Sequence, residues 1–248
     1  MESILSSEIP LAERAYRDLR TAIVRCEFEP GVRLRVEDLA RRFEISSSPV
    51  REALSRLSEQ GFVRALDKRG FRVAPLTIEG IVDLTRIRHL LECEALRDAI
   101  THGDDAWEAA IVAAGHSLAL SEQRLSSQTV ALDNAWSERH RAFHLAFYAS
   151  CSSPLLLDLV SELFDRAERY RRYSASHRLA ERSKHNEHKE LMQAVLSRDA
   201  DKAVACLRKH ISGTERRVSD ALKALERQVQ NGMSSSMSSK PLDALAGA

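Results

Sequence analysis

Apolar residues recur with a helical period over most of the chain, and this pattern divides it into two unequal parts. Residues 1–76 hold three short periodic segments followed by two apolar stretches around a polar turn, which predicts three helices and a β-hairpin. Residues 77–230 hold about six longer periodic segments and no convincing strand, which predicts an antiparallel helical bundle. Residues 231–248 are small and polar, as expected of a disordered tail. The predicted fold class is therefore mainly α.

The third helix of the first part has one apolar face and one small, polar face. Its apolar residues have the spacing i, i+3, i+4 and i+7, and they are Val50, Ala53, Leu54 and Leu57. Ser48 and Pro49 suit the N-cap and the first helical position, and Gly61 suits the end of the helix. The opposite face carries Ser48, Arg51, Glu52, Ser55 and Arg56. A short helix with such a face fits the major groove of DNA.

The distribution of charge along the chain supports DNA binding, although the net charge of the whole chain does not indicate it. The 248 residues are 44% hydrophobic and 29% charged, and the net charge is only +1. Residues 46–76, however, hold six basic residues against three acidic ones, a local net charge of +3. Two of the basic residues, Lys68 and Arg69, lie in the predicted hairpin turn with Gly70. Such a tip can contact a DNA backbone or a minor groove.

Histidines lie on three apolar helix faces of the second part. His140 and His144 are four residues apart, so they share a face, and aromatic residues on the same face predict that it points inward. His188 and His210 lie on two further apolar faces. Neutral imidazoles that converge in a dry interior suit Zn²⁺, Ni²⁺ or a similar divalent ion. For any single histidine on an apolar face, a hydrogen-bonded core residue is the more usual explanation.

Several of these segments resemble a known family. SSSPVREALSRLSEQGFV (46–63) resembles the recognition helix of GntR-type winged helix-turn-helix repressors, and residues 67–73 resemble their wing. Residues 78–230 resemble the all-helical FCD ligand domain, through IRHLLE (87–92), the Phe143-His144 pair and an E-H…D…A…H ending over 187–210. The resemblance implies DNA contacts from Ser46, Ser47, Ser48, Arg51, Ser55, Arg56, Lys68, Arg69 and Gly70. Ser47 replaces an arginine of the family motif.

The resemblance also implies a metal-containing sensor domain. In that family three histidines and one aspartate bind a divalent metal, so the implied cofactor here is Zn, Ni or Mn. The implied ligands are His140, His144, His188 and His210, with His140 at the position of the aspartate. The implied partner of the metal in holding a small carboxylate effector is Arg88, for which an ordinary salt bridge with Glu92 at i+4 is the alternative. Arg169, Arg171, Arg172 and Arg178 are expected to form a solvated helix end.

Two functions from different classes fit these features. The first is a cytoplasmic, homodimeric transcriptional regulator that binds a palindromic operator and responds to a small organic acid, with repression as the expected sign of regulation. The second is a metal-dependent hydrolase-like enzyme, but no HExxH pattern, phosphate-binding glycine loop or nucleophile motif is present. A regulator whose histidine site is purely structural is a further alternative. The absence of a long apolar segment or a secretory pattern argues against a membrane association.

Overall fold

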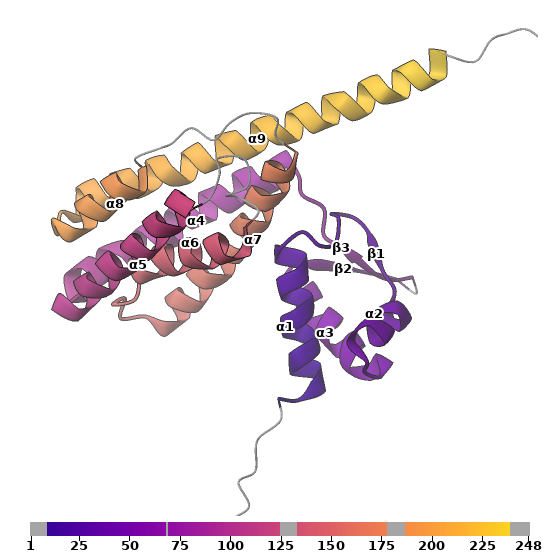
Figure 1. Ribbon diagram of the computed structural model, residues 1–248, viewed down its shortest axis with the longest axis horizontal. Coiled ribbons are helices and arrows are strands. Elements are labelled where there is room, and N and C mark those ends of the chain that lie inside the picture. The colour runs from indigo at the N-terminus through magenta and orange to yellow at the C-terminus, as the bar shows by residue number, and fades with distance from the viewer. Residues whose placement is uncertain (1–8, 68, 125–132, 178–186, 239–248) are drawn as a thin grey trace, which may run out of the picture.

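The chain folds into a small N-terminal domain and a larger helical bundle, joined by a short extended linker (Figure 1). This computed structural model describes residues 9–67, 69–124, 133–177 and 187–238. No helix within the described residues is long and apolar enough to cross a membrane. The predicted order, a winged helix-turn-helix followed by an all-helical domain, is confirmed.

The N-terminal domain consists of three helices and a three-stranded antiparallel sheet. The helices are α1 (Leu11–Val24), α2 (Val36–Phe43) and α3 (Ser47–Glu59). The strands are β1 (Arg33–Leu34), β2 (Val63–Leu66) and β3 (Gly70–Val73), in the order β1-β3-β2. The hairpin of β2 and β3 matches the prediction. Strand β1 was not predicted, because a two-residue strand is too short to leave an alternating pattern.

The recognition helix α3 is held by the stripe that its sequence predicts. Val50, Ala53, Leu54 and Leu57 are all fully buried in the core of this domain. The start of the helix differs from the prediction, since Ser46, and not Ser48, is the N-cap residue. Pro49 then lies in the first turn, where the backbone N–H groups have no intrahelical acceptor and its missing donor costs nothing. Gly61 follows the helix with φ +73°, a conformation that favours glycine.

The bundle contains six helices within the described residues. They are α4 (Ile78–His102), α5 (Asp105–Arg124), α6 (Asn134–Ala146), α7 (Pro154–Ser176), α8 (Glu187–Leu196) and α9 (Ala200–Ser238). Side chains of Thr77, Asp133 and Ser153 cap α4, α6 and α7 by accepting backbone hydrogen bonds. The predicted cap-plus-proline start at Ser153-Pro154 is therefore confirmed.

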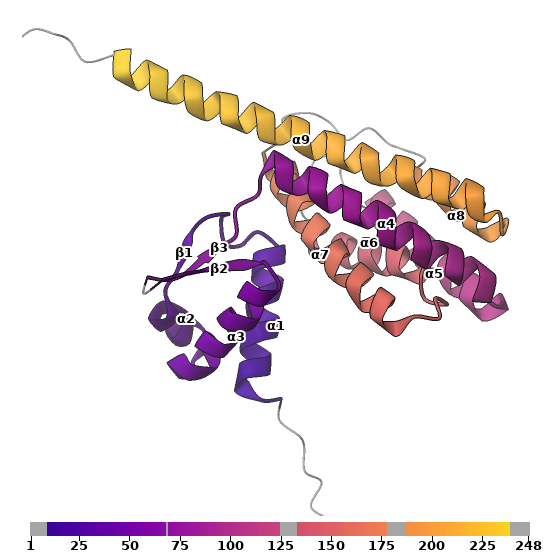
Figure 2. The same cartoon turned by 180° about the vertical axis from the view of Figure 1, so that it is seen from behind.

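The longest helix, α9, lies beside α4 along the bundle and continues past its end (Figures 1 and 2). It extends to Ser238, so the first eight residues of the segment expected to be a disordered tail are helical. Nothing in the polar sequence of this segment breaks a helix, because it contains neither proline nor consecutive glycines before Ser238. Residues 239–248 lie outside the described part of the chain.

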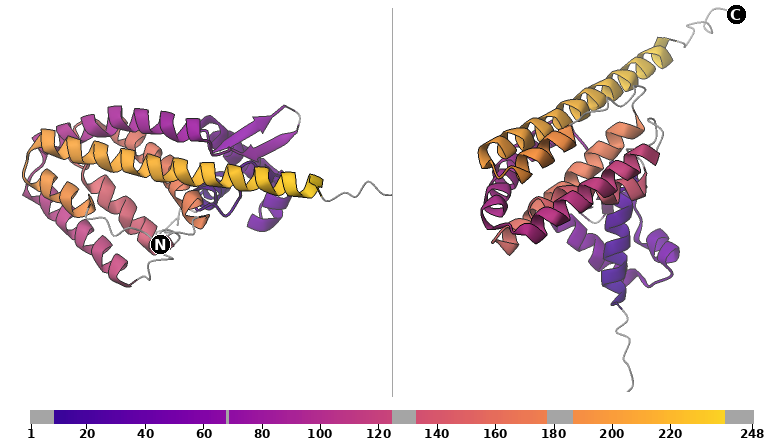
Figure 3. Two further views of the ribbon diagram at one scale, coloured as in Figure 1. Left: turned by 90° about the horizontal axis from the view of Figure 1, so that it is seen from above. Right: turned by 60° about the vertical axis from the view of Figure 1, so that its left-hand side comes forward.

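The two domains meet along α7, whose other side packs into the bundle (Figure 3). Arg20 of α1 forms an ion pair with Asp165 at 2.5 Å. The side chain of Arg166 donates a hydrogen bond of 2.7 Å to the carbonyl oxygen of Gln60, at the end of α3. Arg169 donates to the carbonyl oxygen of Ala74, just after β3. Helix α7 thus contacts the recognition helix, the sheet and the bundle core.

Candidate metal centre and nucleic-acid interface

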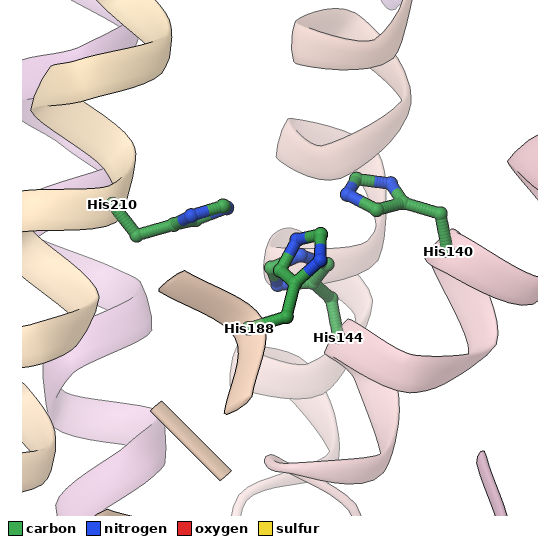
Figure 4. A group of neighbouring side chains, drawn as sticks. All are labelled: His140, His144, His188 and His210. Carbon is green, nitrogen blue, oxygen red and sulfur yellow. The ribbon is translucent and has the colours of Figure 1, made fainter. Parts of the chain in front are cut away.

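Four histidines converge in the bundle from three helices that are distant in sequence (Figure 4). Helix α6 supplies His140 and His144, α8 supplies His188, and α9 supplies His210. The inward direction of the α6 face is set by Trp136, which is 2% exposed in the same core. As the apolar spacing predicts, all four imidazoles point toward one another.

The rings are close enough to share one ion. One ring nitrogen from each histidine can be chosen so that all four nitrogens lie within 4.8 Å of one another. The ring centroids of His144 and His210 are 5.0 Å apart, and those of His140 and His144 are 4.6 Å apart. No carboxylate belongs to this group among the described residues. Nitrogen donors without a carboxylate favour borderline ions such as Zn²⁺ and Ni²⁺ over Mn²⁺.

The buried ring nitrogens of α6 lack protein partners. Both nitrogens of His144 and Nδ1 of His140 are buried and have no hydrogen-bond partner among the described residues. Burial, followed by the neighbouring imidazoles, lowers the pKa of both histidines well below the usual value of 6.5. Both rings are therefore neutral near pH 7, which is the form that binds metals. Buried donors and acceptors normally find partners, so these atoms fit a bound metal ion.

Two glutamates lie behind the outer nitrogens of the cluster. His210 Nδ1 is 3.0 Å from Glu187 Oε2, which leaves its other nitrogen facing the centre. His188 Nδ1 is 4.0 Å from Glu122 Oε1. Carboxylates in this position fix the tautomer of a ligating histidine and raise its basicity. Neither glutamate was predicted as a site residue, although Glu187 belongs to the E-H pair of the sequence motif.

Arg88 lies in the same interior and is already paired. It forms a two-pronged ion pair with Glu92, with Nε–Oε1 at 2.5 Å, and both side chains are buried. Tyr148 donates a 2.9 Å hydrogen bond to the other oxygen of Glu92. Burial is the largest cause of the lowered pKa of His144, and two neighbouring imidazoles follow. The positive charge of Arg88 lowers this pKa further. Arg88 therefore acts electrostatically on the histidine cluster, and the salt bridge with Glu92 that was the alternative explanation for this residue is present.

The expectation that the arginines of α7 form a solvated helix end is wrong. Arg169 and Arg172 are 4% and 5% exposed. Arg171 pairs with Glu168 and lies over the ring of Trp136, which in turn stacks on His140. These arginines lie inside because α7 is covered on one side by the bundle and on the other by the winged helix, which a helical period alone does not reveal. Arg178 lies outside the described residues.

The second candidate site is the outer surface of the winged helix. Ser46, Ser48, Arg51 and Ser55 are exposed, and Ser47 is half-buried at the start of α3. The guanidinium of Arg51 lies 3.5 Å from Glu37, and both side chains are at least 60% exposed. An ion pair this exposed is weak, so Arg51 is available for another partner. At the wing, Arg69 is exposed and Gly70 has φ +84°.

Of the nine predicted DNA contacts, one turns away from this surface and one lies outside the described residues. Arg56 turns toward α1, where it pairs with Glu13 at 2.9 Å and stacks on Tyr16 at 4.0 Å. Its charge is therefore used inside the domain. Arg56 follows Ser55 by one residue, and consecutive residues of a helix point in different directions around its axis. Arg56 therefore lies on the flank of α3 that faces α1. Lys68 lies outside the described residues.

Comparison with known families divides the chain as the fold does. Residues 11–73 match the family described as bacterial regulatory proteins, gntR family. Residues 83–213 match the FCD domain. Each match falls within one of the two structural domains.

Similar curated proteins are transcriptional regulators. An uncharacterized HTH-type transcriptional regulator, BphR of Paraburkholderia xenovorans (strain LB400), is 39% identical over 215 residues, covering 84% of this chain and 88% of that protein. The HTH-type transcriptional repressor GlaR of Escherichia coli (strain K12) is 37% identical over 201 residues, covering 79% and 90%. These relatives decide against the enzyme alternative.

Solved structures share the same architecture. A GntR-family regulator from Pseudomonas syringae pv. tomato is 29% identical, with a TM-score of 0.53 and coverage of 88% of each chain. Escherichia coli McbR/YncC is 20% identical, with a TM-score of 0.70 over 86% of this chain and 99% of that one. At 20% identity the second likeness concerns the fold alone.

The buried histidines predict acid sensitivity of the metal-free protein. In the folded chain the pKa values of His140 and His144 are lowered, whereas an unfolded histidine titrates near 6.5. The unfolded state therefore binds more protons below pH 6.5. Stability should be flat above that pH and fall below it, by up to about 1.4 kcal/mol per pH unit for each histidine. Urea unfolding between about pH 7.5 and 5 measures this slope.

The control is an exposed histidine in the same domain. His144→Phe keeps a buried ring but removes the titrating group, so it should flatten the slope. His116→Phe, on the exposed side of α5, should leave the slope as it is. Equal slopes in the three proteins would show that the cluster does not control acid stability.

Proposed function

Since the chain belongs to the GntR family of bacterial transcriptional regulators and carries an FCD domain, we propose that it is a metal-containing repressor controlled by a small carboxylate. The winged helix binds operator DNA. The bundle binds a divalent metal through His140, His144, His188 and His210 and receives the effector beside it. The relative GlaR is named a repressor, which supports the proposed sign of regulation.

One observation carries the sensor part of this proposal. Both ring nitrogens of His144 are buried and have no partner in the described part of the chain, and they lie among four convergent imidazoles. A purely structural core histidine would hydrogen-bond at least one of them. A divalent ion, when bound, neutralises this deficit and acts as a Lewis acid toward an anionic oxygen.

The four histidines bring no negative charge to the ion. With one ligating aspartate, the centre would carry one positive charge; with four neutral imidazoles it carries two. An anionic ligand from outside the protein is therefore favoured more strongly here than in a site with a carboxylate ligand. Arg88 is the proposed second anchor. Its guanidinium is held in place by Glu92, and the carboxylate of the effector would compete with Glu92 for the same N–H donors.

In the DNA part of the proposal, Arg51 reads a base and the wing contacts the backbone. Arg51 is 60% exposed on the face of α3 that carries the small serines. A guanidinium can donate two hydrogen bonds to one guanine edge. Ser47 has a single hydroxyl in place of the family's arginine, so the neighbouring base pair should be read less stringently.

Exposed apolar side chains support a homodimer through the bundle. Val82 and Leu90 on α4, and Leu155 and Leu159 on the adjacent α7, are between 39% and 70% exposed. Large apolar groups gathered on neighbouring helices mark association surfaces. A second copy of the same chain is the proposed occupant, because a two-fold protein places two recognition helices on the two halves of a palindromic operator.

The metal proposal predicts a stoichiometric ion. Protein purified without a metal-affinity tag should hold about one divalent ion per chain by inductively coupled plasma mass spectrometry. Removing it with 1,10-phenanthroline should lower the melting temperature, because the ion binds only the folded state. His144→Ala should lose the ion, and His116→Ala, in the exposed face of α5, should keep it. A metal-free native protein, or full occupancy in His144→Ala, would refute the site.

The same proteins test the sensor role. A panel of small mono- and dicarboxylates should contain at least one compound that raises the melting temperature of the metal-loaded protein and releases it from operator DNA. If that compound releases metal-free or His144→Ala protein equally well, the metal is structural only.

The DNA proposal predicts a selective loss for Arg51. An operator obtained by selection from random duplexes should bind Arg51→Ala more weakly by about 1–3 kcal/mol. Binding to an unrelated duplex should change much less, because a base contact contributes only to the cognate sequence. Arg86→Ala, an exposed arginine on α4, should change neither affinity. Fluorescence anisotropy measures the affinities of the unaltered protein and both variants for both duplexes. An equal loss on both duplexes would make Arg51 a phosphate contact.

The dimer proposal predicts that one charge on the apolar surface separates the subunits. Sedimentation of the full chain at micromolar concentration should give a dimer, and Leu90→Glu should shift it toward the monomer because it buries an unpaired carboxylate. Leu11→Glu, at a similarly exposed leucine of α1, should remain dimeric. A monomeric unaltered chain would contradict the proposal.

A further inference from the structure

A second cavity lies between the winged helix and the bundle, away from the histidines. Its volume is about 240 Å³. Gly61 and Phe62 line it from the end of α3, Asp83 and Ile87 line it from α4, and Arg166 and Arg169 line it from α7. The two arginines lie on the side of α7 opposite Phe164, whose ring is 5.6 Å from those of His140 and His144. Helix α7 therefore separates this cavity from the candidate metal centre.

Most arginines near this junction have a carboxylate partner. Arg20 and Arg141 share Asp165, at 2.5 and 2.9 Å, and Arg171 pairs with Glu168. Arg166 and Arg169, in contrast, form no ion pair within the described parts of the chain. The acidic group in the cavity wall, Asp83, is exposed and forms no ion pair with either of them there.

The two cavity arginines are held by backbone carbonyls and have spare donors. Arg166 donates from Nη2 to the carbonyl of Gln60, and Arg169 donates from Nη2 to that of Ala74. The Nε atom of each is buried and has no partner among the described residues. A guanidinium has five donors in a fixed plane, so each has N–H groups to offer to a ligand.

The positive charge of Arg169 is deeply buried and not neutralised. Arg169 is 4% exposed, and burial lowers the pKa of its guanidinium. The acidic groups that act on its charge are the Cys26 thiol and the Tyr170 phenol. Burial raises the pKa of Cys26 to about 11 and also raises that of Tyr170, so both are neutral at physiological pH. A buried charge without a counter-ion is costly, and an anion would remove this cost.

From this geometry we propose that the interdomain cavity binds a small dianion between Arg166 and Arg169. Phosphate and short dicarboxylates fit, because forked guanidinium donors match their oxygens and a volume of about 240 Å³ is large enough to hold them. This site is distinct from the metal centre and goes beyond the proposed function. The same two arginines join α7 to the end of the recognition helix at Gln60 and to the end of the sheet at Ala74, so a dianion that fixes their guanidinium groups favours one orientation of the DNA-binding domain.

Isothermal titration calorimetry with inorganic phosphate and with malonate tests the site. Ionic strength is held constant with sodium chloride. The neutral chelator 1,10-phenanthroline is present throughout, since it removes metal-dependent carboxylate binding without itself being an anion. The unaltered protein should bind at least one of the two dianions, and Arg166→Gln should bind it at least about tenfold more weakly, because a charged hydrogen bond is lost.

Matched variants decide what such a loss means. Arg86→Gln removes the same charge from an exposed position one turn from Asp83 and should bind like the unaltered protein. Arg166→Lys keeps the charge but not the fork, so it should bind with intermediate affinity, and it serves as the test if Arg166→Gln does not fold. No binding to the unaltered protein, undiminished binding to Arg166→Gln, or equal weakening in Arg86→Gln would overturn the proposal.

The metal proposal can fail without affecting this one. His144→Ala should retain phosphate or malonate binding, because its side chain lies on the other side of α7. Loss of dianion binding in His144→Ala would place the anion at the histidine cluster and would also overturn the interdomain site.

Discussion

The helical domain is organised around buried imidazole nitrogens that no described residue of the chain satisfies. An unsatisfied buried polar atom costs about 1–3 kcal/mol, and His140 and His144 together present three such atoms in one interior. Aromatic rings from α6 and α7 surround them, so water cannot easily replace a ligand. The same arrangement that destabilises the empty fold would be relieved by the proposed ion. Three helices converge on one point, and whatever binds there joins α6, α8 and α9.

Helix α7 connects this interior to the DNA-binding domain. Phe164 packs on two of the histidines, while Asp165 and Arg166, the next residues along the chain, contact α1 and the end of α3. Because a helix is stiff, a shift of its inner face is transmitted to its outer face within the same turn. Arg166 and Arg169 on that outer face, which form no ion pair within the described residues, are the proposed second place where a ligand acts on the same helix. The orientation of the recognition helix is thus held by few, mostly polar contacts.

The arginines of the bundle and those of the DNA-binding domain differ in their ion pairs. In the bundle, Arg88, Arg141 and Arg171 each have a carboxylate within the protein. On the DNA side, Arg51 has only an exposed and weak partner, and Arg69 is exposed at the wing. These three arginines of the bundle are therefore neutralised within the protein, whereas Arg51 and Arg69 lie on the surface where a polyanion could reach them. This explains how a chain of net charge +1 can present a basic surface.

The sequence alone determined the two-domain architecture, the buried stripe of α3, the wing and the convergence of four histidines, because each depends on the period of apolar residues along single helices. The tertiary structure decided what depends on neighbours distant in sequence. It turned Arg56 toward Glu13 and Tyr16, placed Glu122 and Glu187 behind the histidines, and buried the arginines of α7 between two domains. It also continued α9 to Ser238. A helical period tells which residues share a face, but whether that face meets solvent, a carboxylate or another domain is set by packing, since side-chain charges interact through space and not along the chain.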